Sequence, residues 1–344
     1  MNIFDFINAK QISLYLGTVP PVTTIDQALF PNDKQLGMEM ELAKGKNQKP
    51  VALRMSQFDV AVRPRVMKAE LNIEKRELPF FKESILIREK DRQQLLLAIS
   101  ANNQNLVDFI LKQVYNNYLA LVQGAEIQAK RMRTQLIQKG EINIVTPSGD
   151  IVVDYGVPVE HKETISDTSK KWSNPAADIV GDIERWQKIF TDEGKAKPTR
   201  LLLTSKTFGY IRKNAAILAE IRGLTNPIVT EQMVIAYLNN KLGVQIAILN
   251  GTFVNEEGTT LNYYEDNIVT LIPPGTLGRT VFGTTPEEVD KIYGTSKLDT
   301  EIVNTGVAIT TMVKEDPVTV ETKVSSMCLP SFEGSENCFF AVVA

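Results

Sequence analysis

One segment constrains the fold more than any other. From about Asn102 to Lys139, apolar residues recur at a period close to 3.6, which predicts one amphipathic helix. Asn102 or Asn103 can cap its start, and Gly140 suits the position after its end. At 1.5 Å per residue, about 35 residues would span about 50 Å, whereas the mean helix has about 11–12 residues. Because no second long helix is available to pair with it, we expect a single helix lying across a sheet. Basic residues crowd its carboxyl end, where they favour the helix dipole: Lys130, Arg131, Arg133 and Lys139.

Composition sets the class of protein. The chain has 344 residues, with 38 Lys and Arg against 41 Asp and Glu, and its length indicates two domains or one core with large excursions. The formal charge of −3 argues against tight wrapping of nucleic acid. Two cysteines, Cys328 and Cys338, are too few for a disulfide framework or a four-cysteine zinc site, so we expect buried thiols. We see no targeting segment and no apolar stretch of about 18–20 residues, and we expect a cytosolic protein where it is made.

The chain before the long helix lacks a helical period. Residues 1–33 carry short apolar bursts around Pro20, Pro21 and Pro31, and we expect an arm there. Residues 34–88 indicate extended β structure with many turns. Residues 49–92 hold 11 basic and 7 acidic side chains, which is typical of a charged, half-exposed ribbon. Examples of the strands expected within 34–88 are Met38–Leu42, Val51–Arg54 and Phe58–Val62.

The chain after the long helix falls into three parts. A β pair, Glu141–Val145 and Asp150–Tyr155, follows directly. From Asp167 to about Thr305 short helices and strands alternate, which indicates a second, α+β domain. Its expected helices are Ala176–Phe190, Ser205–Glu220 and Thr230–Leu242, and its expected strands are Arg200–Leu203, Gln245–Leu249, Thr259–Tyr264 and Asn267–Ile272. Within it, residues 220–300 hold 10 acidic and 5 basic side chains. Strands are then expected at Val307–Val313 and Thr319–Ser326, and the apolar end Phe339–Val343 is expected in a sheet of the first domain.

The sequence offers little for catalysis. It has no phosphate-binding loop, dinucleotide fingerprint, nucleophile elbow or zinc-protease motif. The single histidine, His161, follows a strand in a polar segment, where we expect a solvated loop side chain. Asp150 and Asp154, four apart on one strand face, could form a carboxylate pair, although such residues more often belong to turns and edges. Trp172 and Trp186 are expected to be packing anchors. We therefore predict no catalytic, cofactor-binding or metal-binding residues.

Several short blocks, taken in order, point to a family. They are Glu126-Ile127-Gln128-Ala129 with Leu136-Ile137-Gln138-Lys139-Gly140, Asp154-Tyr155-Gly156, Lys171-Trp172-Ser173 with Asp178 and Asp182-Ile183-Glu184, Gly251-Thr252-Phe253-Val254 with Leu261-Asn262, and Ser325-Ser326 with Leu329-Pro330. In order and spacing, this chain resembles the major capsid proteins of tailed bacteriophages, in the group typified by the lambda major capsid protein. The resemblance runs from about Leu36 to Ala344, and the first 35 residues match least.

The resemblance implies an α+β fold of the Hong Kong ninety-seven phage capsid type. It implies an N-terminal arm at 1–35, an extended E-loop at 36–90, a peripheral P domain at 91–165 and 307–344, and an axial A domain at 166–306. Such proteins form hexamers and pentamers of an icosahedral procapsid, which expands around packaged double-stranded DNA, and they have no catalytic site or cofactor.

The implied partners are other copies of the chain, a scaffolding protein, a portal, a decoration protein as a further candidate, and DNA through weak non-specific contacts. No membrane is involved, and the implied location is the virion, after assembly in the host cytoplasm. The basic ribbon and the acidic 220–300 segment suggest electrostatic steering between subunits. Two alternatives stay open: a bacterial nanocompartment shell that encloses an enzyme, and a hydrolase that uses Asp150 and Asp154.

Overall fold

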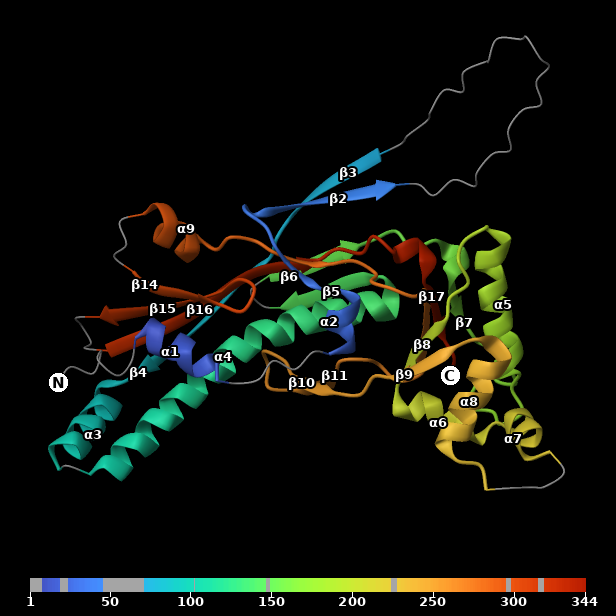
Figure 1. Ribbon diagram of the computed structural model, residues 1–344, viewed down its shortest axis with the longest axis horizontal. Coiled ribbons are helices and arrows are strands. Elements are labelled where there is room, and N and C mark those ends of the chain that lie inside the picture. Colours follow the sequence, from blue (N-terminus) through green and yellow to red (C-terminus); the bar gives the residue numbers. More distant parts are fainter. Residues whose placement is uncertain are drawn as a thin grey trace, which may run out of the picture.

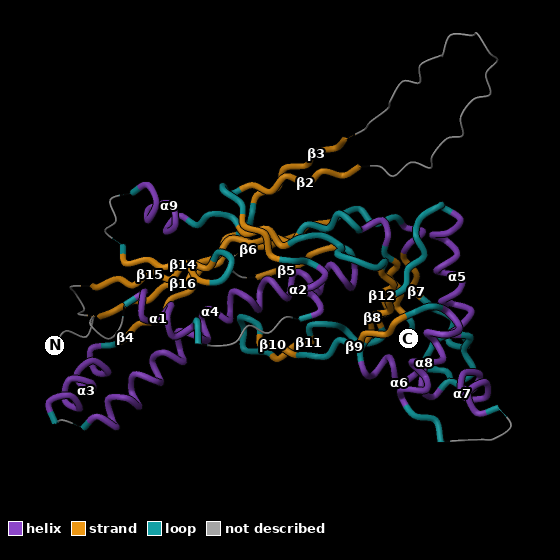
Figure 2. Tube along the Cα trace, viewed as in Figure 1, coloured by secondary structure: helices purple, strands orange, loops and turns teal. Residues whose placement is uncertain are grey.

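A long helix and two sheets organise the molecule. The computed structural model describes residues 8–18, 24–45, 71–101, 103–146, 149–223, 228–294, 298–314 and 319–344. Helix α4 (Gln104–Lys139) runs beneath a six-stranded sheet along an elongated body, and a five-stranded sheet with helices α5 to α8 forms one end (Figure 1). Figure 2 shows the same division, with strands gathered above the long helix and short helices grouped at that end.

Helix α4 confirms the prediction of one long helix. It has 36 residues, its first turn is capped by the Asn103 side chain, which accepts from the Leu106 N–H, and it ends at Gly140 with φ of 73°. A residue with a Cβ is strained at that φ, which explains the glycine. Near the middle of α4, Tyr118, Leu121 and Val122 pack against the six-stranded sheet, so the helix buries its apolar stripe on that sheet.

The six-stranded sheet joins segments from both halves of the chain. Its order is β1-β13-β16-β15-β14, and β4 also pairs with β16, which is 12 residues long. The strands are β1 (Asn32–Lys34), β4 (Phe80–Ile87), β13 (Thr280–Phe282), β14 (Asp299–Val303), β15 (Val307–Lys314) and β16 (Thr319–Pro330). The expected strands at Val307–Val313 and Thr319–Ser326 are thus present. Strands β13 and β14 lie inside the 166–306 segment, and their place beside β16 and β15 differs from the expected boundary at 306.

Two smaller β pairs lie beside this sheet. Strands β2 (Glu39–Gly45) and β3 (Leu71–Glu77) form an antiparallel ribbon that projects away from the body (Figure 1). The expected strand at Met38–Leu42 is part of it, whereas Val51–Arg54 and Phe58–Val62 lie outside the described residues. Strands β5 (Glu141–Thr146) and β6 (Gly149–Asp154) form the expected hairpin after α4. Helix α3 (Glu89–Ser100), which was not predicted, connects β4 to α4.

The described part of the N-terminal arm is folded onto its own chain. It contains helices α1 (Ala9–Leu16) and α2 (Ile25–Leu29), followed by β1, which pairs in parallel with β13. Leu29 and Phe30 are buried in the central core, which the lack of a helical period in this part of the sequence did not indicate. Helices of one or two turns are too short to show a period in the sequence, and they are stabilised by tertiary packing.

The five-stranded sheet has the order β7-β17-β12-β8-β9. Its strands are β7 (Lys162–Thr164), β8 (Arg200–Leu203), β9 (Gln245–Ile248), β12 (Ile268–Ile272) and β17 (Phe339–Val342). The apolar C-terminal strand β17 is buried in a sheet, as expected, but it pairs with β12 and β7 rather than with strands of the six-stranded sheet. Its alternate side chains explain this position, because Phe339 packs in the core of this end and Phe340 packs in the central core around α4.

Helices cover this sheet, and a small hairpin extends from it. The helices are α5 (Ile179–Asp192), α6 (Ser205–Lys213), α7 (Ala215–Arg222) and α8 (Glu231–Leu242), and the hairpin is β10 (Thr252–Val254) with β11 (Thr260–Asn262). The single helix expected at Ser205–Glu220 is two helices, because Asn214 has an extended φ and ψ and caps α7 through the Ile217 N–H. A last helix, α9 (Pro286–Tyr293), lies on the outer side of the six-stranded sheet and was not predicted.

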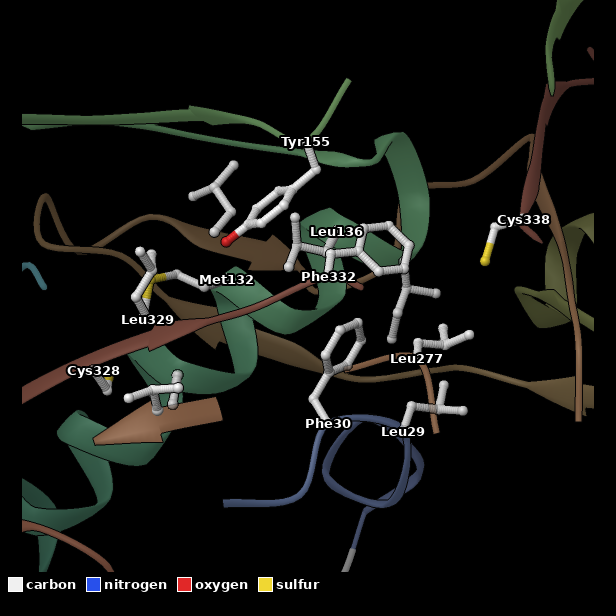
Figure 3. Packing of buried hydrophobic residues seen from close by; sticks show 14 of the residues in the cluster. Leu29, Phe30, Met132, Leu136, Tyr155, Leu277, Cys328, Leu329, Phe332 and Cys338 are labelled. Atoms are coloured by element: carbon white, nitrogen blue, oxygen red, sulfur yellow. The ribbon is translucent and has the colours of Figure 1, made fainter. Parts of the chain in front are cut away.

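The central core forms where α4, the arm and the returning chain meet. Figure 3 shows Phe30 of the arm, Met132 and Leu136 of α4, Tyr155 and Phe332 gathered in one cluster. The Phe30 and Phe332 rings meet edge to face at 5.6 Å between centroids. The arm is therefore part of the central core of the subunit.

Candidate assembly surfaces

The two carboxylates on β6 lie at the edge of the β5–β6 hairpin. Asp150 and Asp154 are both exposed on one face of the strand, as their spacing predicted. The Asp154 carboxylate accepts a hydrogen bond from the Gly156 N–H at 2.8 Å, which closes the turn after the strand. Asp150 borders a shallow surface pocket of about 470 Å³, and Asp154 is not among the residues that line it. The pair therefore has the features of turn and edge residues.

His161 is fully buried, so the prediction of a solvated loop residue is wrong. Its Nε2 lies 3.0 Å from Oε1 of Glu193, and its ring centroid lies 4.6 Å from that of Phe190. The short 3₁₀ turn at Val159–His161 places the imidazole against the end of α5, which a residue pattern alone does not reveal. Burial opposes ionisation of Glu193, but its hydrogen bonds to Lys195 and His161 hold the pKa of that carboxyl below its ordinary value. The imidazole thus packs the turn at Val159–His161 against the end of α5.

The cysteines and tryptophans are packing residues, as predicted. Cys328 and Cys338 are both buried and free, and they lie well apart in Figure 3. Burial raises the pKa of the Cys328 thiol to about 12, so this thiol is protonated at neutral pH. Trp172 and Trp186 stack with centroids 5.8 Å apart, and both indoles are buried in the core of the five-stranded sheet.

Across the described ranges, no group of three or more His, Cys, Asp or Glu side chains is placed to hold a metal ion. Among the same residues, no helix is both long and apolar enough to cross a membrane.

The β2–β3 ribbon is fixed at its base and extends outward from there. Arg76 donates to the main-chain oxygen of Asp154 at 3.0 Å, and its guanidinium lies 5.0 Å from the centroid of the Tyr155 ring. Along the ribbon, Lys75 pairs with Glu41 across the strands at 3.0 Å. The base is thus held by the β5–β6 hairpin, while the rest of the described ribbon stands away from the body (Figure 1).

Exposed apolar side chains gather on several described elements. They are Leu36 and Met38 before β2, Phe80 and Leu86 on β4, Leu96, Leu97, Leu106 and Phe109 on α3 and α4, Val145 and Val152 on the β5–β6 hairpin, and Val289, Ile292 and Tyr293 on α9. Soluble proteins that act alone rarely expose large contiguous apolar patches, and such patches mark surfaces that contact other molecules. In the described part of this chain, the exposed apolar side chains are distributed over several elements.

A buried arginine joins the arm to the long helix, and the sequence analysis did not find it. Arg133 donates through Nε to Oδ2 of Asp26 on α2 at 2.8 Å, and through Nη1 to Oδ1 of Asn32 on β1 at 3.2 Å. Arg133 is 2% exposed and Asp26 is 5% exposed. The sequence places Arg133 among the basic residues that favour the helix dipole. The nearest sequence signal of its burial is its position beside the apolar residue Met132.

The β10–β11 hairpin joins the five-stranded end to the long helix. Glu256, in the turn between the two strands, accepts hydrogen bonds from Gln128 at 2.6 Å and from Arg131 at 3.1 Å, both on α4. The Arg131 guanidinium also lies 5.3 Å from the centroid of the Phe253 ring. The angle between the two ends of the subunit therefore depends on polar contacts as well as on the shared core.

Solved structures show the class of the fold. One is a protein described as a prophage capsid protein of E. coli CFT073, with 13% identity, a TM-score of 0.61 and coverage of 98% of this chain and 99% of that one. A phage-related protein from Bordetella bronchiseptica RB50 has 12% identity, a TM-score of 0.52 and coverage of 97% of each chain. The capsid of cyanophage A-1(L) has 9% identity, a TM-score of 0.51 and coverage of 92% and 91%. The fold is thus the Hong Kong ninety-seven type found in phage capsid proteins.

The sequence comparison defines the family. A model of the family described as phage major capsid protein E matches residues 11–343. The chain belongs to the phage major capsid protein E family, and it is a structural protein of bacteriophage capsids. No curated protein gives a match. The predicted resemblance and the predicted fold are both confirmed.

Proposed function

We propose that this protein forms the icosahedral head of a tailed phage by assembling into hexamers and pentamers. The observation that carries the proposal is the match of the capsid family over residues 11–343. The exposed apolar surfaces and the projecting β2–β3 ribbon support it, because a subunit that works within a shell needs surfaces that other copies cover. In this proposal the shell first forms as a procapsid, expands, and encloses double-stranded DNA.

The parts of the subunit take the following roles in the proposal. The segment at 36–90 is the E-loop, whose strand β4 joins the six-stranded sheet; α4 with strands β13 to β16 forms the P domain, and the five-stranded sheet with α5 to α8 forms the A domain. Strand pairing supports including β13 and β14 in the P domain and β17 in the A domain, which moves the boundaries expected from the sequence. The segment at 1–35 is the N-terminal arm, and its described part supports a role as a brace within the subunit.

The proposed partners are other copies of this chain, a scaffolding protein and a portal, with a decoration protein as a further candidate. Packaged DNA is proposed to touch the shell weakly and without sequence preference, in keeping with the formal charge of −3. The location that follows is the virion, after assembly in the host cytoplasm.

Electron microscopy of the purified protein, with sedimentation in parallel, tests the proposal. We expect closed shells of uniform size or rings of five and six subunits. Nuclease-protected DNA inside particles from infected cells is the expected content, whereas an enriched enzyme in its place would indicate a nanocompartment. A chain that stays monomeric at high concentration, both alone and when expressed with a scaffolding protein of the same phage, would contradict the assembly role.

A further inference from the structure

Helix α9 has its polar side inside and its apolar side outside. Glu287 and Glu288 are 6% and 9% exposed, whereas Val289, Ile292 and Tyr293 are 44%, 52% and 79% exposed. An amphipathic helix on a protein that acts alone normally turns its apolar stripe to the core. The reversed arrangement indicates that another molecule covers the outer stripe.

Ion pairs hold α9 in this orientation. Glu287 accepts from Lys323 at 2.5 Å and from Ser325 at 2.8 Å, both on the outer side of β16, and Glu288 accepts from Lys34 at 2.6 Å. These contacts attach the acidic face of the helix to the sheet. The apolar stripe cannot turn inward without leaving these buried carboxylates and their partners unpaired, which is costly.

The opposite side of the same sheet carries a second exposed apolar surface. Helices α3 and α4 meet in a corner at which Leu96, Leu97, Leu106 and Phe109 are exposed, with Leu97 at 68% and Phe109 at 65%. Helix α4 packs on the face of β16 that carries Val320 and Val324, whereas α9 lies on the face that carries Lys323 and Ser325. Within one copy, the sheet therefore separates the α9 stripe from the α3–α4 corner (Figure 1).

The two surfaces have complementary charges beside them. Asp290 flanks the α9 stripe, next to Val289 and three residues before Tyr293, and Lys112 lies one helical turn after Phe109 on the exposed face of α4. Within the described part of one copy, neither Asp290 nor Lys112 has an ion-pair partner. A contact between the two surfaces would bury both apolar patches and pair these two charges.

We propose that α9 of one copy packs on the α3–α4 corner of the next copy, with Asp290 beside Lys112. The proposal rests on the proposed function, because it requires many copies of the chain in one assembly. The contact is heterologous, since different surfaces of the two copies meet, and a repeated contact of this kind forms a ring when the rotation between copies closes and an open filament when it does not. It gives a subunit one way to select its neighbour through an apolar centre and a charged rim.

Disulfide trapping tests which surfaces meet. The two native cysteines are buried, so Tyr293→Cys and Phe109→Cys chains each carry one accessible thiol. After mild oxidation of mixed assemblies, we expect covalent dimers that contain one chain of each kind, and few from either variant alone. Val159, which is 81% exposed, lies on neither surface, so Val159→Cys is the matched control. Mixed with either of the other two variants, it should give no such dimers. Shells that assemble without these mixed dimers, or that link Tyr293→Cys only to itself, would overturn the proposal.

A charge exchange tests the same contact without an added bond. We expect Asp290→Lys and Lys112→Asp each to slow assembly about two- to five-fold for each contact, and the double variant to restore it. A double variant that assembles more slowly than both single variants would overturn the pairing. If the unmodified protein forms no shells, the proposed function fails; if it forms shells and the double variant is not restored, only this contact fails.

Discussion

At the scale of single residues, Arg133 shows how one buried charge ties the arm to the long helix. Its guanidinium is enclosed by Asp26, Asn32 and the helix itself, so removal of the guanidinium leaves a carboxylate uncompensated inside the protein. Breaking a buried ion pair on one side typically costs about 3–5 kcal/mol, whereas replacing both partners with apolar groups is often neutral.

We therefore expect Arg133→Met to lower the free energy of unfolding by about 3–5 kcal/mol, and Asp26→Leu with Arg133→Met to recover most of that loss. Urea unfolding of unassembled subunits, followed by tryptophan fluorescence, measures both changes. Arg133 also donates hydrogen bonds to Asn32 and Thr280. A double variant as unstable as the single one would show that Arg133 stabilises the fold through these hydrogen bonds rather than through its charge.

Gly140 gives a second prediction, because its φ of 73° and its neighbours both exclude a side chain. A Cβ at this position would lie 2.3 Å from Cγ2 of Val157, so Gly140→Ala should cost more than the roughly 1–2 kcal/mol of the left-handed backbone alone. Gly124, in the middle of α4, has no atom within 4 Å of an added Cβ. Gly124→Ala is the matched control and should stabilise the helix by about 0.5–1 kcal/mol in the same unfolding measurement. Equal effects at the two positions would contradict this account.

At the scale of elements, α9 is attached to the sheet through the ionised carboxylate of Glu287. Burial opposes ionisation of Glu287, but the hydrogen bonds from Lys323 and Ser325 outweigh it and hold the pKa of this carboxyl below its ordinary value of 4.5. A lowered pKa in the folded state means that the stabilisation is complete above pH 4.5 and is lost as the pH falls through the folded value. Acid should therefore weaken the attachment of α9 to the sheet through Glu287.

We expect Glu287→Gln to lose part of the acid dependence of the unfolding free energy, while Glu184→Gln, at an exposed position on α5, should retain it. Unfolding curves between pH 3 and pH 7 measure the difference as a change in slope below about pH 4.5. Parallel curves for the two variants and the unmodified protein would show that Glu287 does not carry this dependence.

Elements with a strong local pattern were the ones that the sequence predicted well. Helix α4, the β5–β6 hairpin and the buried strand β8 each have a clear period or a bounded apolar run, and each is present. Helix α9 was missed because its eight residues are too few to establish a helical period. The place of β17 was wrong because strand partners are chosen over long separations, where a local pattern carries no information.

The candidate surfaces could be predicted only in outline. Composition and strand pattern predicted a charged β ribbon before the long helix. The contacts of Arg133 and the burial of His161 could not be predicted, because they depend on neighbours that are remote in the chain. Exposure of Tyr293 and Phe109 likewise cannot be deduced from residue type, since both would ordinarily be expected inside.

At the scale of the whole molecule, the charge distribution predicts that assembly depends on salt. Residues 49–92 have a net positive charge and residues 220–300 a net negative one, so attraction between copies should speed their encounter. The Debye length falls from about 10 Å at 0.1 M to about 3 Å at 1 M, which screens this attraction. We expect the initial rate of assembly, followed by light scattering, to fall as salt is raised over that range. A rate that does not change with salt would contradict steering.

The pairing of distant strands also has a consequence for how the subunit is made. Asn32 pairs with Thr280 and Ile87 with Val320, so two ladders of the six-stranded sheet join residues more than 230 positions apart. Contacts between such distant segments require large loops to close before any stabilisation is gained, and proteins that depend on them fold slowly. Until β4 and β13 arrive, the edges of β16 stay open to pairing with other chains. We therefore expect a newly made chain to be most prone to aggregation in the interval before these two ladders close.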